Sequence, residues 1–204
     1  MDLNRRIEYL YSSNALDNMQ SRKASEEDKN IAIKYKEAKK ALIESVCDII
    51  LCSVDKYECV DGQFGLWHKA KCEEIMGTMN TAMFQDDSLI LKSNSFTYGL
   101  AQKWVNMTLK YLWLLDRLPE GLTAKSLHVP IDSFILKKLQ EENVDEIRRD
   151  GDTYKYKGKS WSQLDDYDVY LDIQTKIGQI AGKTFPIEWE GPAWMDVAKT
   201  RSSK

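Results

Sequence analysis

Hydrophobic residues recur at intervals of three and four along most of this chain, the spacing of one face of an α-helix. The longest such stretch runs from Ser25 to about Cys52. It opens with a capping box, in which Ser25 is followed three residues later by Asp28. The apolar positions that would face the core are Ala38, Ala41, Leu42, Val46, Ile49 and Ile50. We therefore expect a long helix here, with the lysines at 34, 36, 39 and 40 on its solvated face.

The same spacing predicts further helices over 2–11, 64–79, 96–115, 131–139 and 162–181. In the second of these, Trp67, Ile75 and Met79 would point inward. Pro130 occupies the N1 position expected for the helix over 131–139, and Gly182 ends the last one.

Two segments interrupt the helical pattern near the C-terminus. Residues 153–156 read Thr-Tyr-Lys-Tyr and lie between two glycine-containing turns, which predicts a small β-hairpin near residues 150–161. Residues 184–194 contain Pro186, Gly191 and Pro192, so we expect no long helix there, only apolar side chains packed on the body. The expected fold is one mainly α domain over 1–204, with an N-terminal arm at 1–24 and a C-terminal tail at 184–204 that frays at its end.

Composition supports a folded protein that is not embedded in a membrane. The chain has 204 residues, of which 43% are hydrophobic and 30% charged. No apolar run approaches the roughly 20 residues needed to span a bilayer, and Met1 leads into no signal-peptide core, so we expect a cytoplasmic location. The four cysteines are too few for a disulfide scaffold. Pairing His68 and Cys72 with two more cysteines would make a zinc site, but the spacing favours separate thiols, and we expect no metal and no cofactor.

The net charge of −3 argues against a wholly basic nucleic-acid-binding surface. One region of the chain carries a net positive charge instead. Between Gly99 and Leu139 there are six basic and three acidic residues, a local charge of +3. This region also contains the two motifs that carry candidate chemistry.

The first motif is Tyr98-Gly99-Leu100-Ala101-Gln102-Lys103-Trp104-Val105-Asn106, and the second is His128-Val129-Pro130-Ile131-Asp132-Ser133-Phe134. Together they resemble the helix-hairpin-helix DNA glycosylases, the superfamily of endonuclease III and 8-oxoguanine glycosylase. In that family a glycine turn leads into a helix with the catalytic lysine, and a Pro-Val-Asp element supplies the aspartate. This chain lacks the second hairpin glycine and has a longer spacing between lysine and aspartate.

The resemblance implies a glycosylase/lyase that removes a damaged or modified base, with Lys103 as nucleophile and Asp132 as its acidic partner. A lysine amine attacks only after losing its proton, which apolar surroundings favour, and a carboxylate stabilises the developing positive charge on the sugar. The implied DNA contacts are Gly99, Gln102, Asn106, Lys110, His128, Lys137 and Lys138. The implied base-stacking residues are Tyr98, Trp104 and Phe134.

Each of these residues also has an ordinary structural interpretation. Lys103 could extend from a buried helix to water, Asp132 could favour a helix N-terminus, and Asn106 could be a buried amide. A non-catalytic helical module that binds nucleic acid, a nucleotide-type ligand or a protein, in a setting such as phage defence or counter-defence, is the alternative. A hydrolase using His68 or His128 lacks a matching nucleophile motif.

Overall fold

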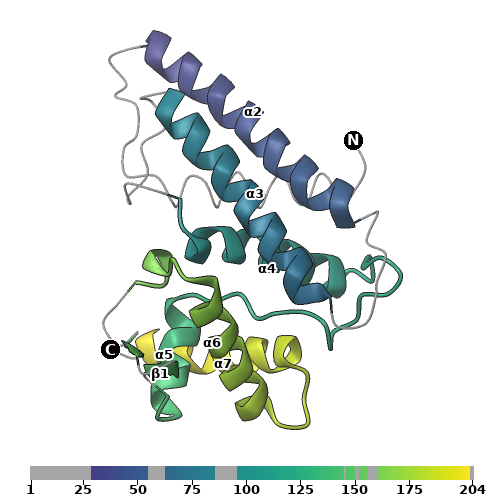
Figure 1. Ribbon diagram of the computed structural model, residues 1–204, viewed down its shortest axis with the longest axis vertical. Helices are drawn as coiled ribbons and strands as arrows, with labels where there is room; N and C mark the ends of the chain where they lie inside the picture. Colours follow the sequence, from purple (N-terminus) through teal and green to yellow (C-terminus); the bar gives the residue numbers. More distant parts are fainter. Residues whose placement is uncertain are drawn as a thin grey trace.

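The computed structural model describes residues 29–54, 63–85, 96–144, 146–149, 152–155 and 160–202. It is mainly helical with one small two-stranded antiparallel hairpin, as the sequence predicts. Two long helices, α2 (Lys29–Val54) and α3 (Phe64–Gln85), lie side by side at one end of the molecule. Helix α4 (Tyr98–Leu114) crosses beneath them and separates them from the C-terminal half (Figure 1).

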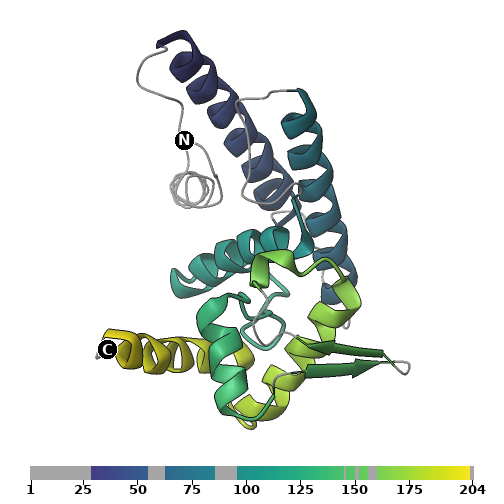
Figure 2. The ribbon, with the colours of Figure 1, turned by 90° about the vertical axis from the view of Figure 1, so that its left-hand side faces the viewer.

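The C-terminal half holds three more helices, a short 3₁₀ turn and the hairpin. The helices are α5 (Ser133–Glu141), α6 (Tyr167–Ala181) and α7 (Pro186–Ser202). The turn η1 (Trp161–Gln163) precedes α6, and the hairpin consists of β1 (Glu146–Arg149) and β2 (Asp152–Lys155). Figure 2 shows this hairpin extending from the body on the side opposite to the end of α7.

Two hydrophobic clusters stabilise these halves. One joins α2, α3 and α4 and includes Trp104, whose side chain is fully buried. The other joins the segment 129–139, Ile147 of β1 and helix α6. Tyr98 and Trp161 pack against both clusters, so the start of α4 is where the two halves meet.

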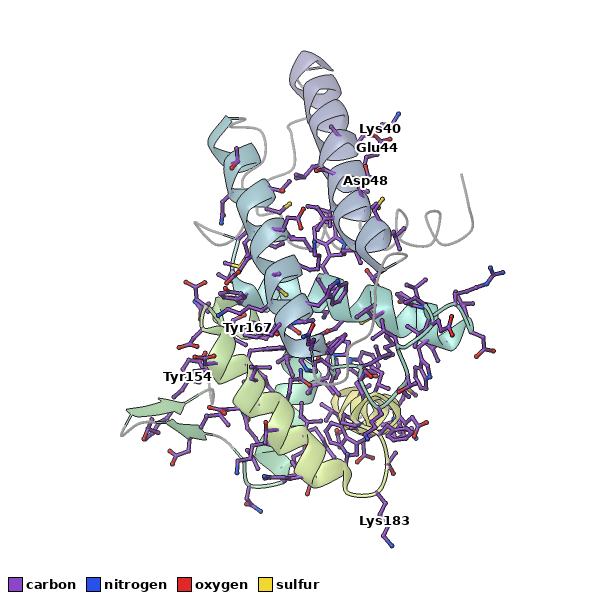
Figure 3. All side chains as sticks on the ribbon, turned by 45° about the vertical axis from the view of Figure 1, so that its right-hand side comes forward. Lys40, Glu44, Asp48, Tyr154, Tyr167 and Lys183 are labelled. Atoms are coloured by element: carbon purple, nitrogen blue, oxygen red, sulfur yellow. The ribbon has the colours of Figure 1, made fainter. Side chains whose placement is uncertain are left out.

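Helix α2 confirms the expected long helix, with Leu42, Val46 and Ile50 buried. Lys40 is exposed, and Figure 3 shows it in a row with Glu44 and Asp48 along one side of the helix. The side chains of the lysines at 34, 36 and 39 lie outside the described residues. So do the helix predicted over 2–11, the N-terminal arm and the capping box at Ser25.

Two helices begin differently from the prediction. Helix α5 begins at Ser133, because Asp132 is its N-cap, so Pro130 is not at N1 and lies in extended chain. Helix α6 is capped by Asp166 and begins at Tyr167, later than the predicted start at residue 162, which lies in η1. In both, an aspartate carboxylate accepts hydrogen bonds from the first free backbone N–H groups, which stabilises a later start. Gly182 ends α6 with a positive φ of 64°, as predicted.

The hairpin lies earlier than predicted. Its strands pair Glu146 with Lys155 and Arg149 with Asp152, so the partner of β2 precedes it instead of following it. Strand β1 contains one apolar residue, Ile147, which is buried beside α6. A single apolar position gives too little alternation to identify a strand from the sequence.

The prediction for the tail was wrong. Residues 186–202 form one continuous helix, α7, that includes Pro192. Pro186 stands at its first position, where no backbone N–H is required. Ile187, Glu190, Ala193 and Val197 are all buried at helical spacing, and this packing offsets the hydrogen bond that Pro192 cannot donate.

Candidate active site

The structure brings the side chains of Lys103 and Asp132 together, although 29 positions separate them in the sequence. The Lys103 Nζ lies 3.2 Å from Asp132 Oδ2. The Lys103 side chain is 23% exposed and that of Asp132 is 14% exposed. The ion pair is therefore partly shielded from water but still reachable, as a group that reacts with a large substrate must be.

Each oxygen of Asp132 has its own set of donors. Oδ1 accepts from the backbone N–H groups of Phe134, at 2.9 Å, and Ile135, at 3.1 Å, and so caps helix α5. Oδ2 accepts from Lys103 and from the Trp194 indole Nε1, at 3.3 Å. The cap fixes the carboxylate, so that Oδ2 is held toward α4 and α7.

Three partly exposed aromatic rings surround this ion pair. The Lys103 ammonium lies 4.7 Å from the centre of the Trp161 ring, within the range of a cation–π contact. Trp194 stacks on Phe134, with ring centres 4.5 Å apart. An amine, a carboxylate and aromatic faces are thus contributed by α4, α5, η1 and α7 to one place on the surface.

Several residues expected to contact DNA lie in the interior instead. Gln102 and Asn106 are 1% exposed, and Trp104 is fully buried, so none of them presents a face to a nucleic acid. The buried Gly99 donates its backbone N–H to Leu164 O at 2.7 Å. A Cβ at Gly99 would lie 2.0 Å from Trp161 O, so this glycine permits close packing of α4 on η1 rather than phosphate binding.

The lysines expected at DNA phosphates all have carboxylate partners. Lys110 pairs with the buried Glu190 and so ties α4 to α7. Lys138 is 2.9 Å from Asp196, and the exposed Lys137 is 3.8 Å from Glu141. Only Lys137 is more than a third exposed among these three, so it alone is readily available to a phosphate.

Of the two other expected stacking residues, Phe134 remains half-buried beside Trp194. Tyr98 faces α3 and α6 instead. Its hydroxyl donates to Glu73 at 2.6 Å, and its ring centre lies 5.5 Å from that of Tyr167. Burial and the contact with Glu73 raise the pKa of Tyr98.

A second cluster, which the sequence analysis did not identify, joins the two histidines of the chain. The rings of His68 on α3 and His128 lie with their centres 5.0 Å apart, and both approach the Tyr170 hydroxyl. On α3 the side chains of Phe64, His68, Cys72, Ile75 and Met79 are buried. That helical spacing was visible in the sequence, but we expected the neighbouring Trp67 to point inward in place of His68.

Hydrogen bonds indicate which ring nitrogen of His68 carries a hydrogen. The Asn106 Oδ1 lies 2.9 Å from His68 Nε2 and can only accept, so this nitrogen carries a hydrogen. His68 Nδ1 lies 2.9 Å from the Tyr167 hydroxyl, which donates its hydrogen to Gly65 O at 2.8 Å. The Tyr170 hydroxyl accepts from Asn106 Nδ2 and is 2.9 Å from His128 Nδ1, to which it can donate.

The surroundings of this cluster favour the uncharged form of its histidine, cysteine and tyrosine side chains. Burial and the neighbouring His128 hold the pKa of His68 well below its usual value, although the Asn106 bond acts in the opposite direction. Burial lowers the pKa of His128 to about 4. It also raises the pKa values of Cys72, Tyr167 and Tyr170, so at neutral pH every one of these groups is uncharged. His128 is partly buried, and its Nδ1 lies against the Tyr170 hydroxyl.

Cys47 and Cys72 are buried and Cys52 is exposed, whereas Cys59 lies outside the described ranges. The Cys72 Sγ lies 3.8 Å from His68 Nδ1, one helical turn away. Among the described residues, no three His, Cys, Asp or Glu side chains are arranged to hold a metal ion.

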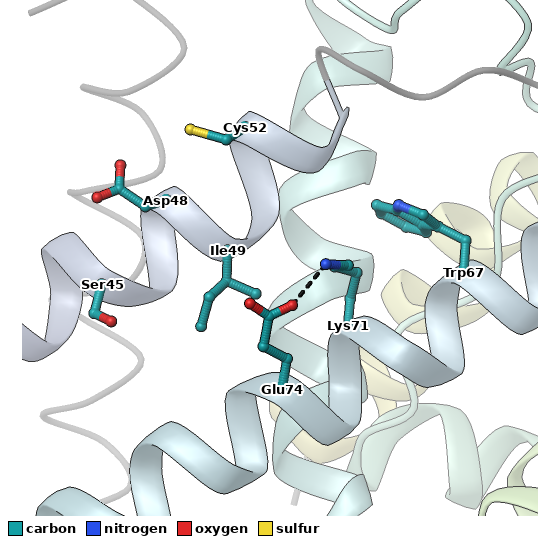
Figure 4. Close-up of a pocket in the computed structure, with 7 residues that line it drawn as sticks. All are labelled: Ser45, Asp48, Ile49, Cys52, Trp67, Lys71 and Glu74. Carbon is teal, nitrogen blue, oxygen red and sulfur yellow. Dashed lines mark hydrogen bonds and ion pairs between the residues drawn. The ribbon is translucent and has the colours of Figure 1, made fainter.

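An open groove lies between α2 and α3, away from Lys103. Figure 4 shows Lys71 and Glu74 of α3 beside Ile49 of α2, with the ion pair between Lys71 and Glu74 at 2.6 Å. Trp67 and the exposed Cys52 also line it.

Comparison with protein-family models, with curated proteins and with solved structures found no match to this chain. Within the part of the chain that the structure describes, no helix combines the length and the apolar character needed to cross a membrane.

Proposed function

We propose that this protein is a DNA glycosylase/lyase that acts on a damaged or modified base, with Lys103 as nucleophile and Asp132 as its acid–base partner. The observation that supports the proposal most strongly is the 3.2 Å contact between the Lys103 amine and the Asp132 carboxylate, beside exposed aromatic rings. The two motifs that resemble the helix-hairpin-helix glycosylases thus contribute to one site.

The geometry supports a definite sequence of bond changes. Asp132 takes a proton from the Lys103 ammonium, and the free amine forms a bond to C1′ of the deoxyribose. The glycosidic bond breaks, and the base leaves with its electron pair and takes up a proton. The C1′–O4′ bond then opens as O4′ is protonated, which leaves a C1′=N iminium on Lys103.

The residues around the ion pair hold the Asp132 carboxylate in place and offer aromatic faces to the base. The N-cap bonds and the Trp194 indole hold the carboxylate in place, so little reorganisation is needed when charge develops on the sugar. Trp161, Trp194 and Phe134 offer ring faces on which a base turned out of the duplex could stack.

Borohydride trapping tests the proposal, because it reduces the iminium to a stable covalent link. Protein incubated with lesion-containing duplexes and borohydride should form a cross-linked species. Lys103→Arg, which keeps a cation beside Asp132 but cannot form the iminium, should bind the same DNA and form no cross-link. Lys176→Ala, at an exposed lysine on α6 that contacts Gln179, is the matched lysine control and should cross-link as the wild type does.

Two outcomes would contradict the proposal. One is a cross-link of unchanged yield in the Lys103→Arg variant. The other is no cross-link across a panel of oxidised, alkylated and deaminated bases and abasic sites, in protein whose circular dichroism shows that it is folded.

The pairing of Lys110, Lys137 and Lys138 with carboxylates favours a second candidate, a helical module that binds a partner without catalysis. Such pairing reduces the release of counterions from DNA, which is the main source of phosphate-driven affinity. Binding of DNA or a nucleotide by wild type and Lys103→Arg alike, with no cross-link in either, would support this candidate.

A further inference from the structure

We infer that Gln102 is a positioning residue, whose amide aligns Asp132 with Lys103. The effect of Gln102 on catalysis rests on the proposed function, but its effect on the position of Asp132 can be tested separately. The supporting observation is a set of paired hydrogen bonds between buried amide side chains and the extended chain that precedes Asp132.

Residues 129–132 lie in extended chain that is not part of the described hairpin. Their backbone groups are bonded by side chains in place of a neighbouring strand. Gln102 Nε2 donates to Ile131 O at 2.9 Å, and Gln102 Oε1 accepts from Ile131 N at 3.1 Å. A single amide thus bonds both polar groups of the residue directly before Asp132.

Gln174 of α6 repeats this arrangement at Val129. Its Oε1 accepts from Val129 N at 3.0 Å, and its Nε2 donates to Val129 O at 2.7 Å. Asn106 bridges the two positions, since its Nδ2 lies 3.1 Å from Gln102 Oε1 and 3.3 Å from Val129 O. The segment is therefore held to α4 and to α6 by matching amide contacts.

The contacts with α4 are in register. Gln102 bonds Ile131, and the next residue, Lys103, bonds the next residue, Asp132. Gln102 is 1% exposed, and its amide also donates to Gly99 O at 2.8 Å. Because an unpaired buried amide is costly, the Gln102 bonds strongly resist any sliding of the segment along α4. Such sliding would separate Asp132 Oδ2 from the lysine amine.

Lysine modification measured by mass spectrometry tests this alignment without reference to catalysis. Wild type, Gln102→Met and Gln174→Met are treated with a limiting amine-reactive reagent, and the rate at Lys103 is compared with that at the exposed Lys137. Methionine keeps the length of glutamine but forms no bond to the backbone. In Gln102→Met we expect Lys103 to react roughly tenfold faster, the factor that corresponds to losing about one hydrogen bond.

Gln174→Met is the matched control, because it removes the same two kinds of bond from the same segment but three residues before Asp132. We expect the Lys103 rate to stay within about twofold of wild type in this variant, because Asn106 still bonds Val129 O and Gln102 still bonds both polar groups of Ile131. An unchanged Lys103 rate in Gln102→Met would overturn the inference, and so would an equal increase in both variants. If Gln102→Met does not fold, Gln102→Asn, whose amide is one methylene too short to span both Ile131 groups, takes its place.

A second measurement connects the alignment to the proposed reaction. At saturating lesion DNA, the cross-linking rate of Gln102→Met should fall by about 100-fold with unchanged affinity, since small displacements of reacting groups have effects of this size. A lower affinity with an unchanged rate would contradict the positioning role. Faster modification of Lys103 in Gln102→Met, together with no cross-link in wild type, would retain the alignment and remove the glycosylase proposal alone.

Discussion

The two oxygens of Asp132 make different contacts, so two substitutions can separate the helix cap from the ion pair. Asn is a good N-cap but carries no charge, whereas Ala provides neither. Asp132→Asn should therefore retain about 1 kcal/mol more stability than Asp132→Ala, measured by urea unfolding. Both variants should lose cross-linking by about 100-fold or more, because the proton acceptor is gone.

Asp166 provides the control for this pair. It caps α6 with the same geometry, with its Oδ1 2.8 Å from Asp168 N and 3.1 Å from Val169 N. Asp166→Asn and Asp166→Ala should differ in stability by a similar amount and should both cross-link normally. Equal losses of cross-linking in the Asp132 and Asp166 variants would mean that cross-linking depends on helix capping and not on the charge near Lys103.

Single residues differ in how far the sequence reveals them. Lys103 and Asp132 belong to short motifs with a recognisable order, so their pairing could be anticipated. The contacts of His68 could not be anticipated, because its partners Asn106 and Tyr167 are far away in the sequence and Trp67 was the residue expected to point inward. Gly99 was identified as important, but its role is steric: backbone of η1 occupies the place of a side chain.

The packing of α4 on η1 leads to a prediction about glycine substitutions in helices. Gly99→Ala places a methyl group into the Trp161 carbonyl and should lower the free energy of unfolding by about 3 kcal/mol, as expected for a rigid overpacked contact. Gly77→Ala on α3 meets open space and should raise it by roughly 0.5–1 kcal/mol, since alanine is the better helix former. Chemical denaturation followed by tryptophan fluorescence measures both, and a neutral Gly99→Ala would contradict the packing.

Some helix boundaries can be predicted from the local hydrophobic pattern, whereas others depend on tertiary contacts. The predictions for α2 and for α4 rested on long amphipathic patterns that local spacing describes well. The end of α2 and both ends of α4 agree with prediction within two residues. Helix α7 was missed because Pro186, Gly191 and Pro192 indicate a break when considered locally. Burial of Ile187, Glu190 and Val197 against the rest of the molecule outweighs that preference.

The buried histidines make the stability of the whole molecule sensitive to acid. Both have folded-state pKa values below the usual value of 6.5, that of His128 at about 4. Between these pH values the unfolded chain binds the protons that the folded chain excludes, so stability falls as pH decreases. His128 should contribute at most about 1.4 kcal/mol per pH unit over this window, and His68 contributes with the same sign.

Replacing one histidine isolates this effect from the titration of carboxylates. His128→Gln removes one titrating group, so its free energy of unfolding should depend less steeply on pH between 6.5 and 4, by at most about 1.4 kcal/mol per unit. Urea unfolding at a series of pH values gives both slopes. Identical slopes for wild type and variant would show that His128 is not held neutral in the folded protein.

The central claim concerns one covalent bond, between the Lys103 amine and C1′ of a lesion nucleotide. Digestion of the borohydride-reduced complex followed by tandem mass spectrometry locates that bond directly. The account predicts the reduced sugar adduct on the peptide that contains Lys103, with fragment ions placing it at that residue. An adduct on another lysine or on the N-terminal amine, with Lys103 unmodified, would contradict it.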